Sequence, residues 1–434
     1  MKRLSLALIG IGFTQLALAA DLSEIYHQAQ DSDAVYAAAR AAYRAGVEKL
    51  PQGRAGLLPQ ASLNANVLNN DSHSSMFGDI NYTSKSANIT VTQPIYRKQN
   101  WEQYEQAKQQ VHVAEAQLAN AAQDLILRTA QAYFDVLQSE DNISFVRAQK
   151  AAIGEQLAQA KRNFEVGTAT ITDSNEAQAR SDLANAQEIA ALNDLQIKQR
   201  ALQRIIGTPP PKLDHLEGKL PLGPPDPANM EAWIAHAEQS SPILKAQRAA
   251  YAVAQREVER NRAGHYPTVD AVASYADNRD QNFGGFQVNT KNALIGVEFN
   301  LPLYQGGLVG SRVREAVANQ DKAREDLEDA RRQVALNTSQ AYLGVTSGAA
   351  QVKALEQALL SSQTALDSTR LGLEVGVRTT VDILNAQQQL YSAKRDLAAA
   401  RYNYILSNLR LKAAAGTLSE TDLNEVDKSL LSSN

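Results

Sequence analysis

The chain has 434 residues, of which 44% are hydrophobic and 21% charged, so it can bury one large core or several smaller ones. Its net charge of −4 gives no bulk basic surface for phosphate groups, and we therefore expect no nucleic-acid partner. It contains no cysteine, which excludes disulfides, thiolate metal ligands and a lipid-anchored cysteine.

The first residues predict a secretory signal peptide. Residues 1–20 start with two basic residues, continue with an apolar stretch, and end in an Ala-x-Ala pattern at Ala17 and Ala19. The apolar stretch is short for a membrane anchor, which needs ~20 residues. We expect cleavage after Ala19 or Ala20. No later segment is long and apolar enough to cross a membrane as a helix, so any membrane-embedded part is expected to consist of strands.

The rest of the sequence repeats itself. The tripeptide Arg-Ala-Gly at 54–56 recurs at 262–264, and Glu-Val-Gly at 165–167 recurs at 374–376. Such self-similarity predicts a tandem duplication of one structural unit. The predicted segments are a signal peptide at 1–20, repeat 1 at 21–208, a Pro-rich linker or equatorial segment at 209–229, repeat 2 at 230–417 and a polar C-terminal tail at 418–434.

Each repeat is expected to contain the same elements: a short amphipathic helix, a second helix, two strands, a very long helix and a return helix. The long helices carry apolar or small residues at steps of four and three, which is the seam of a coiled coil. At 1.5 Å per residue each would be roughly 100 Å long. The predicted helices are 33–53 and 241–262 for the second helix, 97–166 and 305–375 for the long helix, and 172–206 and 380–413 for the return helix.

Four stretches alternate between apolar and polar residues and predict strands at 61–67, 86–92, 268–275 and 291–301. Alternation over ~10 residues is typical of a barrel wall with lipid outside and water inside, although a soluble sheet packed on a core gives the same pattern. Segments rich in Asn, Asp, Ser and Gly predict exposed hairpin loops at 69–85 and 277–290. Four strands cannot close a barrel, because the smallest barrels have about eight strands and open edges are not tolerated in lipid. A membrane location therefore predicts an oligomer, and leaves the number of copies open.

This combination resembles the TolC family of outer-membrane channels over nearly the whole mature chain. Its most specific part is the stretch 375–384, followed by Arg-Tyr-Asn-Tyr at 401–404. The resemblance implies a mainly α protein with transmembrane β: a trimeric 12-stranded β-barrel, four strands per protomer, continued by a long α-helical barrel with a small equatorial domain. It also implies a homotrimer in the lipid of a Gram-negative outer membrane, extending into the periplasm. The implied partners are a periplasmic adaptor (membrane fusion) protein and an inner-membrane pump of the ABC or RND type.

The turns between the long and return helices, at 166–173 and 375–382, are the candidate functional sites. Asp173 and Asp382 begin the return helices, where a capping or first-turn acid is worth about 0.5–1 kcal/mol. The resemblance implies that Asp382 and Arg378 also constrict a channel mouth, and both interpretations can hold. The predicted periplasmic gate comprises Thr172, Asp173, Arg378, Asp382 and Asn385. The turns predicted to dock the adaptor comprise Val166, Gly167, Val375 and Gly376.

Two positions depart from the family pattern. Asn385 stands where relatives often carry a second aspartate, and Leu373 stands where they carry a tyrosine. A mouth with one acidic ring rather than two should bind cations more weakly. Loss of the tyrosine hydroxyl removes one bond that could hold a closed state.

Other chemistry is not indicated. The six histidines are scattered without a metal-binding spacing, no phosphate-binding glycine loop follows a strand, and no nucleophile, base and orienting group occur together. We therefore expect no enzyme activity, no metal and no cofactor. The favoured function is a passive duct that carries drugs or secreted polypeptides outward from an inner-membrane pump. The alternative is a periplasmic coiled-coil adaptor or structural protein without a membrane barrel; the duplication and the four alternating strands argue against it. The sequence names neither the cargo nor the pump.

Overall fold

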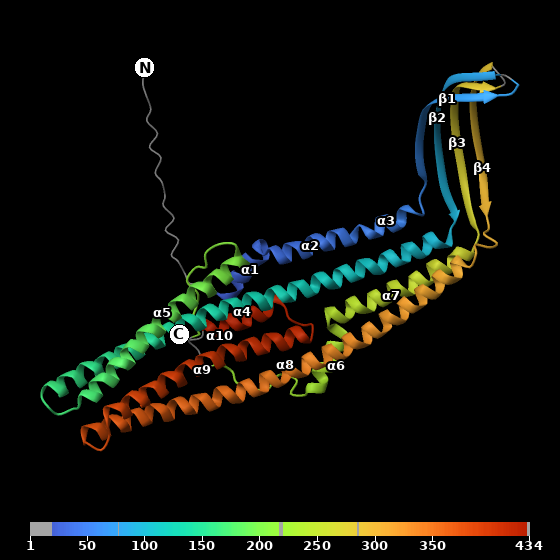
Figure 1. Cartoon of the computed structure of the whole chain (residues 1–434). Helices are drawn as coiled ribbons and strands as arrows, with labels where there is room; N and C mark the ends of the chain where they lie inside the picture. Colours follow the sequence, from blue (N-terminus) through green and yellow to red (C-terminus); the bar gives the residue numbers. More distant parts are fainter. Residues whose placement is uncertain (1–19, 77, 217–219, 284–285, 432–434) are drawn as a thin grey trace, which may run out of the picture. The chain divides into compact units, whose positions relative to one another are not determined.

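The computed structural model describes residues 20–76, 78–216, 220–283 and 286–431 (Figure 1). The signal peptide predicted at 1–20 lies outside the described residues except for Ala20. The chain divides into two compact units. The first unit comprises Met1–Ala37, Ala121–Ala237 and Leu336–Asn434, and the second comprises Ala38–Asn120 and Glu238–Ala335.

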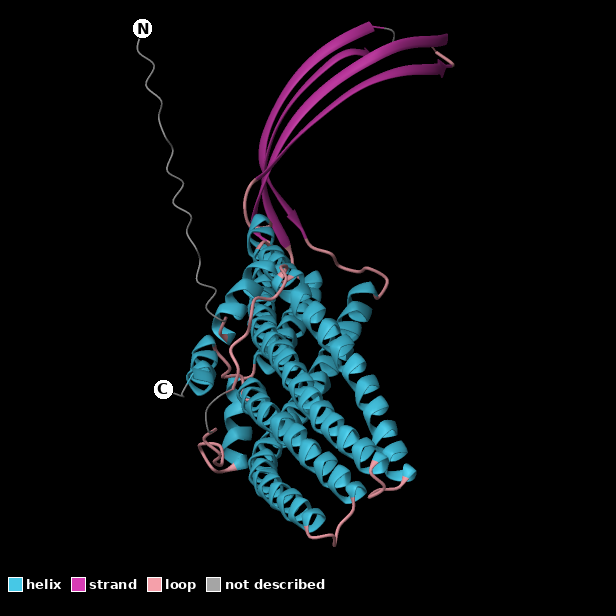
Figure 2. Ribbon diagram, turned by 90° about the vertical axis from the view of Figure 1, so that its left-hand side faces the viewer, coloured by secondary structure: helices cyan, strands magenta, loops and turns pink. Residues whose placement is uncertain are grey.

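The second unit contains one antiparallel sheet of four strands in the order β1-β2-β3-β4, drawn in magenta in Figure 2. The strands are β1 (Gln60–Ser74), β2 (Gly78–Tyr96), β3 (Thr268–Phe283) and β4 (Phe286–Asn300). Neighbouring strands in sequence pair as hairpins, and β2 pairs with β3 across the two halves of the chain. In this order β1 and β4 form the two edges of the sheet.

The strands are longer than the sequence indicated. The prediction of exposed hairpin loops at 69–85 and 277–290 is therefore wrong, because strands occupy most of both segments. The first ladder continues to the pair Ser74 and Gly78, and the second to Phe283 and Phe286. The ladder joins backbone N–H and C=O groups, so it continues through polar residues whose composition alone suggests a loop. A register shift interrupts the second hairpin next to Asp280, whose φ is 57°.

Short helices and the first parts of two long helices complete the second unit. They are the larger part of α2 (Ala34–Val47), α3 (Lys49–Ala55), α7 (Pro242–Arg262), the short 3-10 helix η1 (Ala263–His265), and the beginnings of α4 (Lys98–Glu165) and α8 (Leu308–Glu374). The prediction of one continuous helix over 33–53 is wrong, because α2 ends at Val47. Pro51 lacks an N–H, and its ring clashes with the carbonyl four residues earlier in a continuous helix.

An ion pair with one buried partner fixes the start of α4 to the sheet. The guanidinium of Arg97 donates two hydrogen bonds to the carboxylate of Asp270 at the beginning of β3, with Nε–Oδ1 2.7 Å and Nη2–Oδ2 2.5 Å. The side chain of Asp270 is buried. Such a bidentate pair holds both partners in one geometry, so the direction in which α4 leaves the sheet is restrained.

The first unit is helical and has the larger core. It contains α1 (Leu22–Ser32), the rest of α4 and α8, α5 (Ile171–Ile206), nearly all of α6 (Met230–Ser240), α9 (Thr380–Ala414) and α10 (Glu420–Leu431). Its centre is a cluster of aromatic and aliphatic side chains: Leu22, Ile25, Tyr133, Phe134, Leu202, Ile206, Tyr402, Leu406 and Leu423. None of the described helices combines the length and apolar character needed to cross a membrane.

Described residues near both ends of the chain contribute to this core. The segment 418–434, polar in composition, contains α10, and the carboxylate of Asp427 accepts hydrogen bonds from the backbone N–H groups of Leu22 (2.9 Å) and Ser23 (3.0 Å) at the start of α1. The Pro-rich linker also contributes, because Leu213 is buried and lies beside Ala20 in a parallel bridge. The linker is therefore partly internal.

Candidate functional site: the two helix-tip turns

The two turns that join the long helices to the return helices share one backbone design. Gly167 follows α4 with φ +79°, and Gly376 follows α8 with φ +78°. Both glycines therefore occupy the left-handed conformation that ends a helix, as the sequence predicted. The turns lie side by side in the first unit (Figure 1), and each is closed by backbone N–H groups that bond to the last carbonyls of its long helix.

Each return helix begins with a capping box. The hydroxyl of Thr170 accepts from the N–H of Asp173, and the carboxylate of Asp173 accepts from the N–H of Thr170 at 3.1 Å. Thr379 and Asp382 repeat this arrangement, with a 2.8 Å bond from the Thr379 N–H. The prediction that both aspartates are capping acids is therefore confirmed.

The capping bonds also determine the charge of Asp382. The backbone N–H and the hydroxyl of Thr379 stabilise its carboxylate, with a smaller contribution from Arg378, and lower the pKa of Asp382 below its ordinary value of 3.8. The carboxylate is therefore ionised at neutral pH. Asp382 presents a fixed negative charge at the tip as well as a cap.

Arg378 and Thr172 are exposed and uncommitted. Among the described residues, no hydrogen bond or ion pair involves the side chain of either one, and none joins them to each other. Arg378 instead lies against the end of α8, where a Cβ added to Gly372 would come within 2.6 Å of its Cγ. Gly372 thus leaves room for the base of the arginine side chain.

Asn385 takes part in a link between the two hairpins that sequence analysis missed. Arg180 on α5 donates from Nη2 to Oδ1 of Asn385 (3.1 Å) and from Nη1 to Oε1 of Gln388 (2.6 Å), both on α9. Its Nε donates to Glu176 one turn earlier on α5 (2.9 Å). The Glu176–Arg180 spacing was a visible signal of an ordered arginine, but the partners on α9 lie about two hundred residues away in sequence.

Apolar packing supports this link. Leu384 on α9 is 3% exposed and packs with Ile153 and Ala160 of α4 and with Ala177 and Ala184 of α5. The α4–α5 hairpin and the α8–α9 hairpin therefore share a core close to their turns. Opening one hairpin away from the other would expose Leu384 to water.

The outer surfaces of both turns are apolar. Val166 is 73% exposed in the first turn, and Val375 and Val377 are 66% and 75% exposed in the second. Exposed apolar side chains grouped at the end of a polar helical hairpin are typical of a docking surface.

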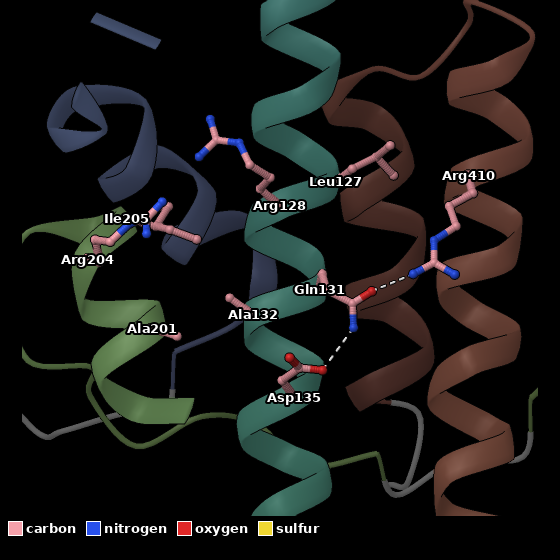
Figure 3. Close-up of a pocket in the computed structure, with 9 residues that line it drawn as sticks. All are labelled: Leu127, Arg128, Gln131, Ala132, Asp135, Ala201, Arg204, Ile205 and Arg410. Carbon is pink, nitrogen blue, oxygen red and sulfur yellow. Dashed lines mark hydrogen bonds between the residues drawn. The ribbon is translucent and has the colours of Figure 1, made fainter. Parts of the chain in front are cut away.

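A pocket lies in the first unit, away from the turns, between α4, α5 and α9 (Figure 3). Its volume is about 420 Å³. Arg410 donates to Gln131 (2.6 Å), which in turn donates to Asp135 (2.8 Å), so a polar chain crosses from α9 to α4. Arg128 at the rim is engaged by Asp33. The pocket contains no nucleophile and base arrangement of the kind that catalysis requires.

One histidine has a defined electrostatic role. His215 in the linker lies 3.2 Å from the carboxylate of Glu140 and 3.7 Å from that of Asp141, both on α4. These carboxylates, Asp141 first, raise the pKa of His215 to about 10. The protonated imidazole of His215 therefore forms ion pairs that hold the linker against α4. Across the described residues, no group of His, Cys, Asp or Glu side chains is arranged to hold a metal ion.

The sheet in the second unit presents an exposed apolar face. Leu63, Ile295 and Val297 are 68%, 88% and 66% exposed. Leu63 lies opposite Ile89 on β2, and Ile295 lies opposite Ala273 on β3, so apolar side chains share one face across all four strands. An apolar face that extends over four strands and is exposed on a single chain indicates a lipid or protein neighbour.

A sheet with one exposed apolar face, joined to helices of 68 and 67 residues, is the kind of fold that a membrane channel protein needs. The chain belongs to the outer membrane efflux protein family, whose model matches residues 25–208 and again residues 233–417. It is an outer-membrane protein.

Individual relatives agree over almost the full chain. The outer membrane protein TolC of Vibrio cholerae is 37% identical over 416 residues, covering 95% of this chain and 94% of its own. The alkaline protease secretion protein AprF of Pseudomonas aeruginosa is 32% identical over 444 residues, with coverage of 100% and 92%. Among solved structures, the open state of the Neisseria gonorrhoeae MtrE outer membrane channel superposes with a TM-score of 0.74 at 20% identity, covering 92% of this chain and 90% of that one.

Proposed function

We propose that the chain is the outer-membrane channel of a tripartite export system, a passive duct gated at its periplasmic helix tips. The observation that carries this proposal is the apolar face of the sheet, where Ile295 is 88% exposed. An apolar residue so exposed is stabilised by lipid on the outside of a barrel wall. The energy for export comes from an inner-membrane pump.

The proposed assembly is a homotrimer. The outer sides of β1 and β4 are the edges of the described sheet, and lipid does not tolerate open edges. Pairing β4 of one copy with β1 of the next gives a closed barrel, and three copies supply twelve strands. We take the number three from the family. The matching order of elements in residues 21–208 and 230–417 supports a tandem duplication.

The proposed partners dock at the turns. Val166 and Gly167 in the first turn, with Val375 and Gly376 in the second, present exposed apolar surface to a periplasmic adaptor protein. The relatives include a protein named for protease secretion, so secreted polypeptides are a proposed cargo alongside drugs. The inner-membrane pump, of the ABC or RND type, selects among them.

The proposed gate uses Thr172, Asp173, Arg378, Asp382 and Asn385. The uncommitted guanidinium of Arg378 supports this assignment, because it can donate to Thr172 or Asp173 of a neighbouring copy without breaking a bond within its own chain. Asn385 is neutral and engaged by Arg180, so the acidic ring consists of Asp382. Opening is an iris-like shift of the α8–α9 hairpin, biased by the adaptor.

Single-channel conductance in planar bilayers tests the gate. Arg378→Ala is expected to raise conductance severalfold, and combining it with Asp173→Ala should raise conductance further. Arg162→Ala, an exposed arginine in the last turn of α4, is the control and should leave conductance unchanged. Wild-type conductance in the Arg378→Ala variant would contradict the gate. A soluble periplasmic monomer, in place of a heat-resistant trimer in outer-membrane fractions, would contradict the channel.

A further inference from the structure

A small cavity lies between the two hairpins, close to the link made by Arg180. Its volume is about 40 Å³, enough for one water molecule or one halide ion. The side chains that matter are Arg180 and Gln187 on α5, Arg395 and Gln388 on α9, and Gln149 on α4. Among the described residues that line it, none is acidic.

The two arginines place excess positive charge around this cavity. Arg180 is balanced by Glu176 and uses three of its five N–H donors in the bonds described above. Arg395 is partly buried, and no hydrogen bond or ion pair in the described chain involves its guanidinium. Arg180, Arg395 and Glu176 together carry one net positive charge. Both arginines are only partly exposed to water, so a counterion at the cavity would stabilise this charge.

Gln149 supplies a second, independent indication of a ligand. The residue is 7% exposed, and its buried Oε1 has no hydrogen-bond partner in the described chain. Buried carboxamide oxygens without a partner are rare in folded proteins. Half a turn about its last side-chain bond exchanges the carboxamide oxygen and nitrogen, so the N–H donors take the place of the unpartnered Oε1. There they can donate to an anion. In the present orientation, Oε1 can accept only from a donor such as water.

We propose that this cavity binds a monovalent inorganic anion of halide size, held between the guanidinium groups of Arg180 and Arg395 with an N–H of Gln149. One such anion neutralises the net charge of the group. Because its ligands come from α4, α5 and α9, the anion ties the α4–α5 hairpin to the α8–α9 hairpin. The site depends only on these contacts and is independent of the proposed duct function.

Bromide anomalous diffraction tests the site directly. The full-length protein, purified in detergent and crystallised from sodium bromide, is expected to show an anomalous peak in the cavity. Arg395→Gln should abolish the peak, and Arg200→Gln, an exposed arginine on α5 away from the cavity, should retain it. A water molecule without anomalous signal in the wild-type cavity would overturn the proposal.

Thermal unfolding tests the same site in solution. Chloride is titrated against gluconate, which is too large for the cavity, at constant ionic strength. The wild-type protein should be stabilised as chloride rises, and Arg395→Gln should need at least tenfold more chloride for half of the effect. Arg395 is the informative position because removing its guanidinium breaks no bond in the described chain. Equal chloride dependence in both proteins would refute the site.

Discussion

The first and second helix-tip turns have the same backbone and different chemistry. Both have a left-handed glycine and a Thr–Asp capping box. Two residues after the glycine, however, the first turn has Ala169 and the second has Arg378. Four residues before the glycine, the first has Asn163 and the second has Gly372, which accommodates that arginine. The shared features define the turn, and the differences give the second turn a cation that the first turn lacks.

The return helices differ in the same way. Eight residues after the glycine, the first has the exposed Asn175 and the second has the buried Leu384. One position further, the first has the acid Glu176 and the second has the amide Asn385, and Arg180 bonds to both. The first hairpin therefore supplies the cation of the link, and the second supplies neutral acceptors and the apolar anchor.

Removing the buried side chain of Leu384, which packs between the two hairpins, is expected to have the largest effect on stability. Leu384→Ala deletes a buried side chain shared by both hairpins and should cost about 2–4 kcal/mol. Hydrogen exchange should accelerate in the first turns of α9 and in the facing part of α5. Leu183→Ala, which removes a 56% exposed side chain, should change little. Similar losses in both variants would mean that Leu384 does not anchor the hairpins.

The capping boxes test whether the two turns are equivalent. Thr170→Val and Thr379→Val each remove one hydroxyl acceptor and should each cost about 1 kcal/mol. Because the two boxes have the same geometry, the losses should agree, as measured by hydrogen exchange of the first turn of α5 or α9. A much larger loss at Thr379 would show that the second turn depends on its cap for more than helix initiation.

The lowered pKa of Asp382 predicts a pH dependence at the second turn. A depressed folded-state pKa contributes stability that is present above the unfolded value of 3.8 and is lost as pH falls through the lower folded value. Protection of the first turn of α9 should therefore be constant from pH 7 to 5 and should weaken below pH 4. Asp382→Asn should remove this dependence; an unchanged acid transition in that variant would assign it to another group.

The exposed valines should have the smallest effect on folding. Val166→Ser and Val375→Ser change exposed side chains on the outer surface of the tips, so stability should move by less than about 0.5 kcal/mol. Adaptor binding, measured by crosslinking yield, should fall in both. Unchanged crosslinking in both variants would remove the turns from the docking surface.

Much of the architecture was predictable because it depends on local patterns. The steps of three and four in 97–166 required a long helix, Gly167 and Gly376 required its end, and the alternation around Ile89 and Ile295 required strands. The capping role of Asp173 and Asp382 followed from their position at the start of the return helices. The break before Lys49 was also readable from Pro51, although one continuous helix was predicted over 33–53.

Other features depended on partners distant in sequence. The continuation of β1 to Ser74 depends on backbone pairing with β2. Polar side chains do not predict this pairing, and they do not prevent it. The folding of α10 depends on Asp427 meeting the start of α1. Likewise, nothing next to Arg180 or Arg395 indicates Asn385 or Gln149 as a neighbour.

The sequence by itself determined the elements, their order and the design of each turn, because period, glycine position and capping residues act over a few bonds. Only the tertiary structure decided which charges find partners and which do not. Among the described residues, Arg180 has hydrogen-bond partners on α9, whereas no hydrogen bond or ion pair involves the side chain of Arg378 or Arg395. That difference comes from the packing of α9 against α4 and α5, which brings side chains about two hundred residues apart within hydrogen-bonding distance.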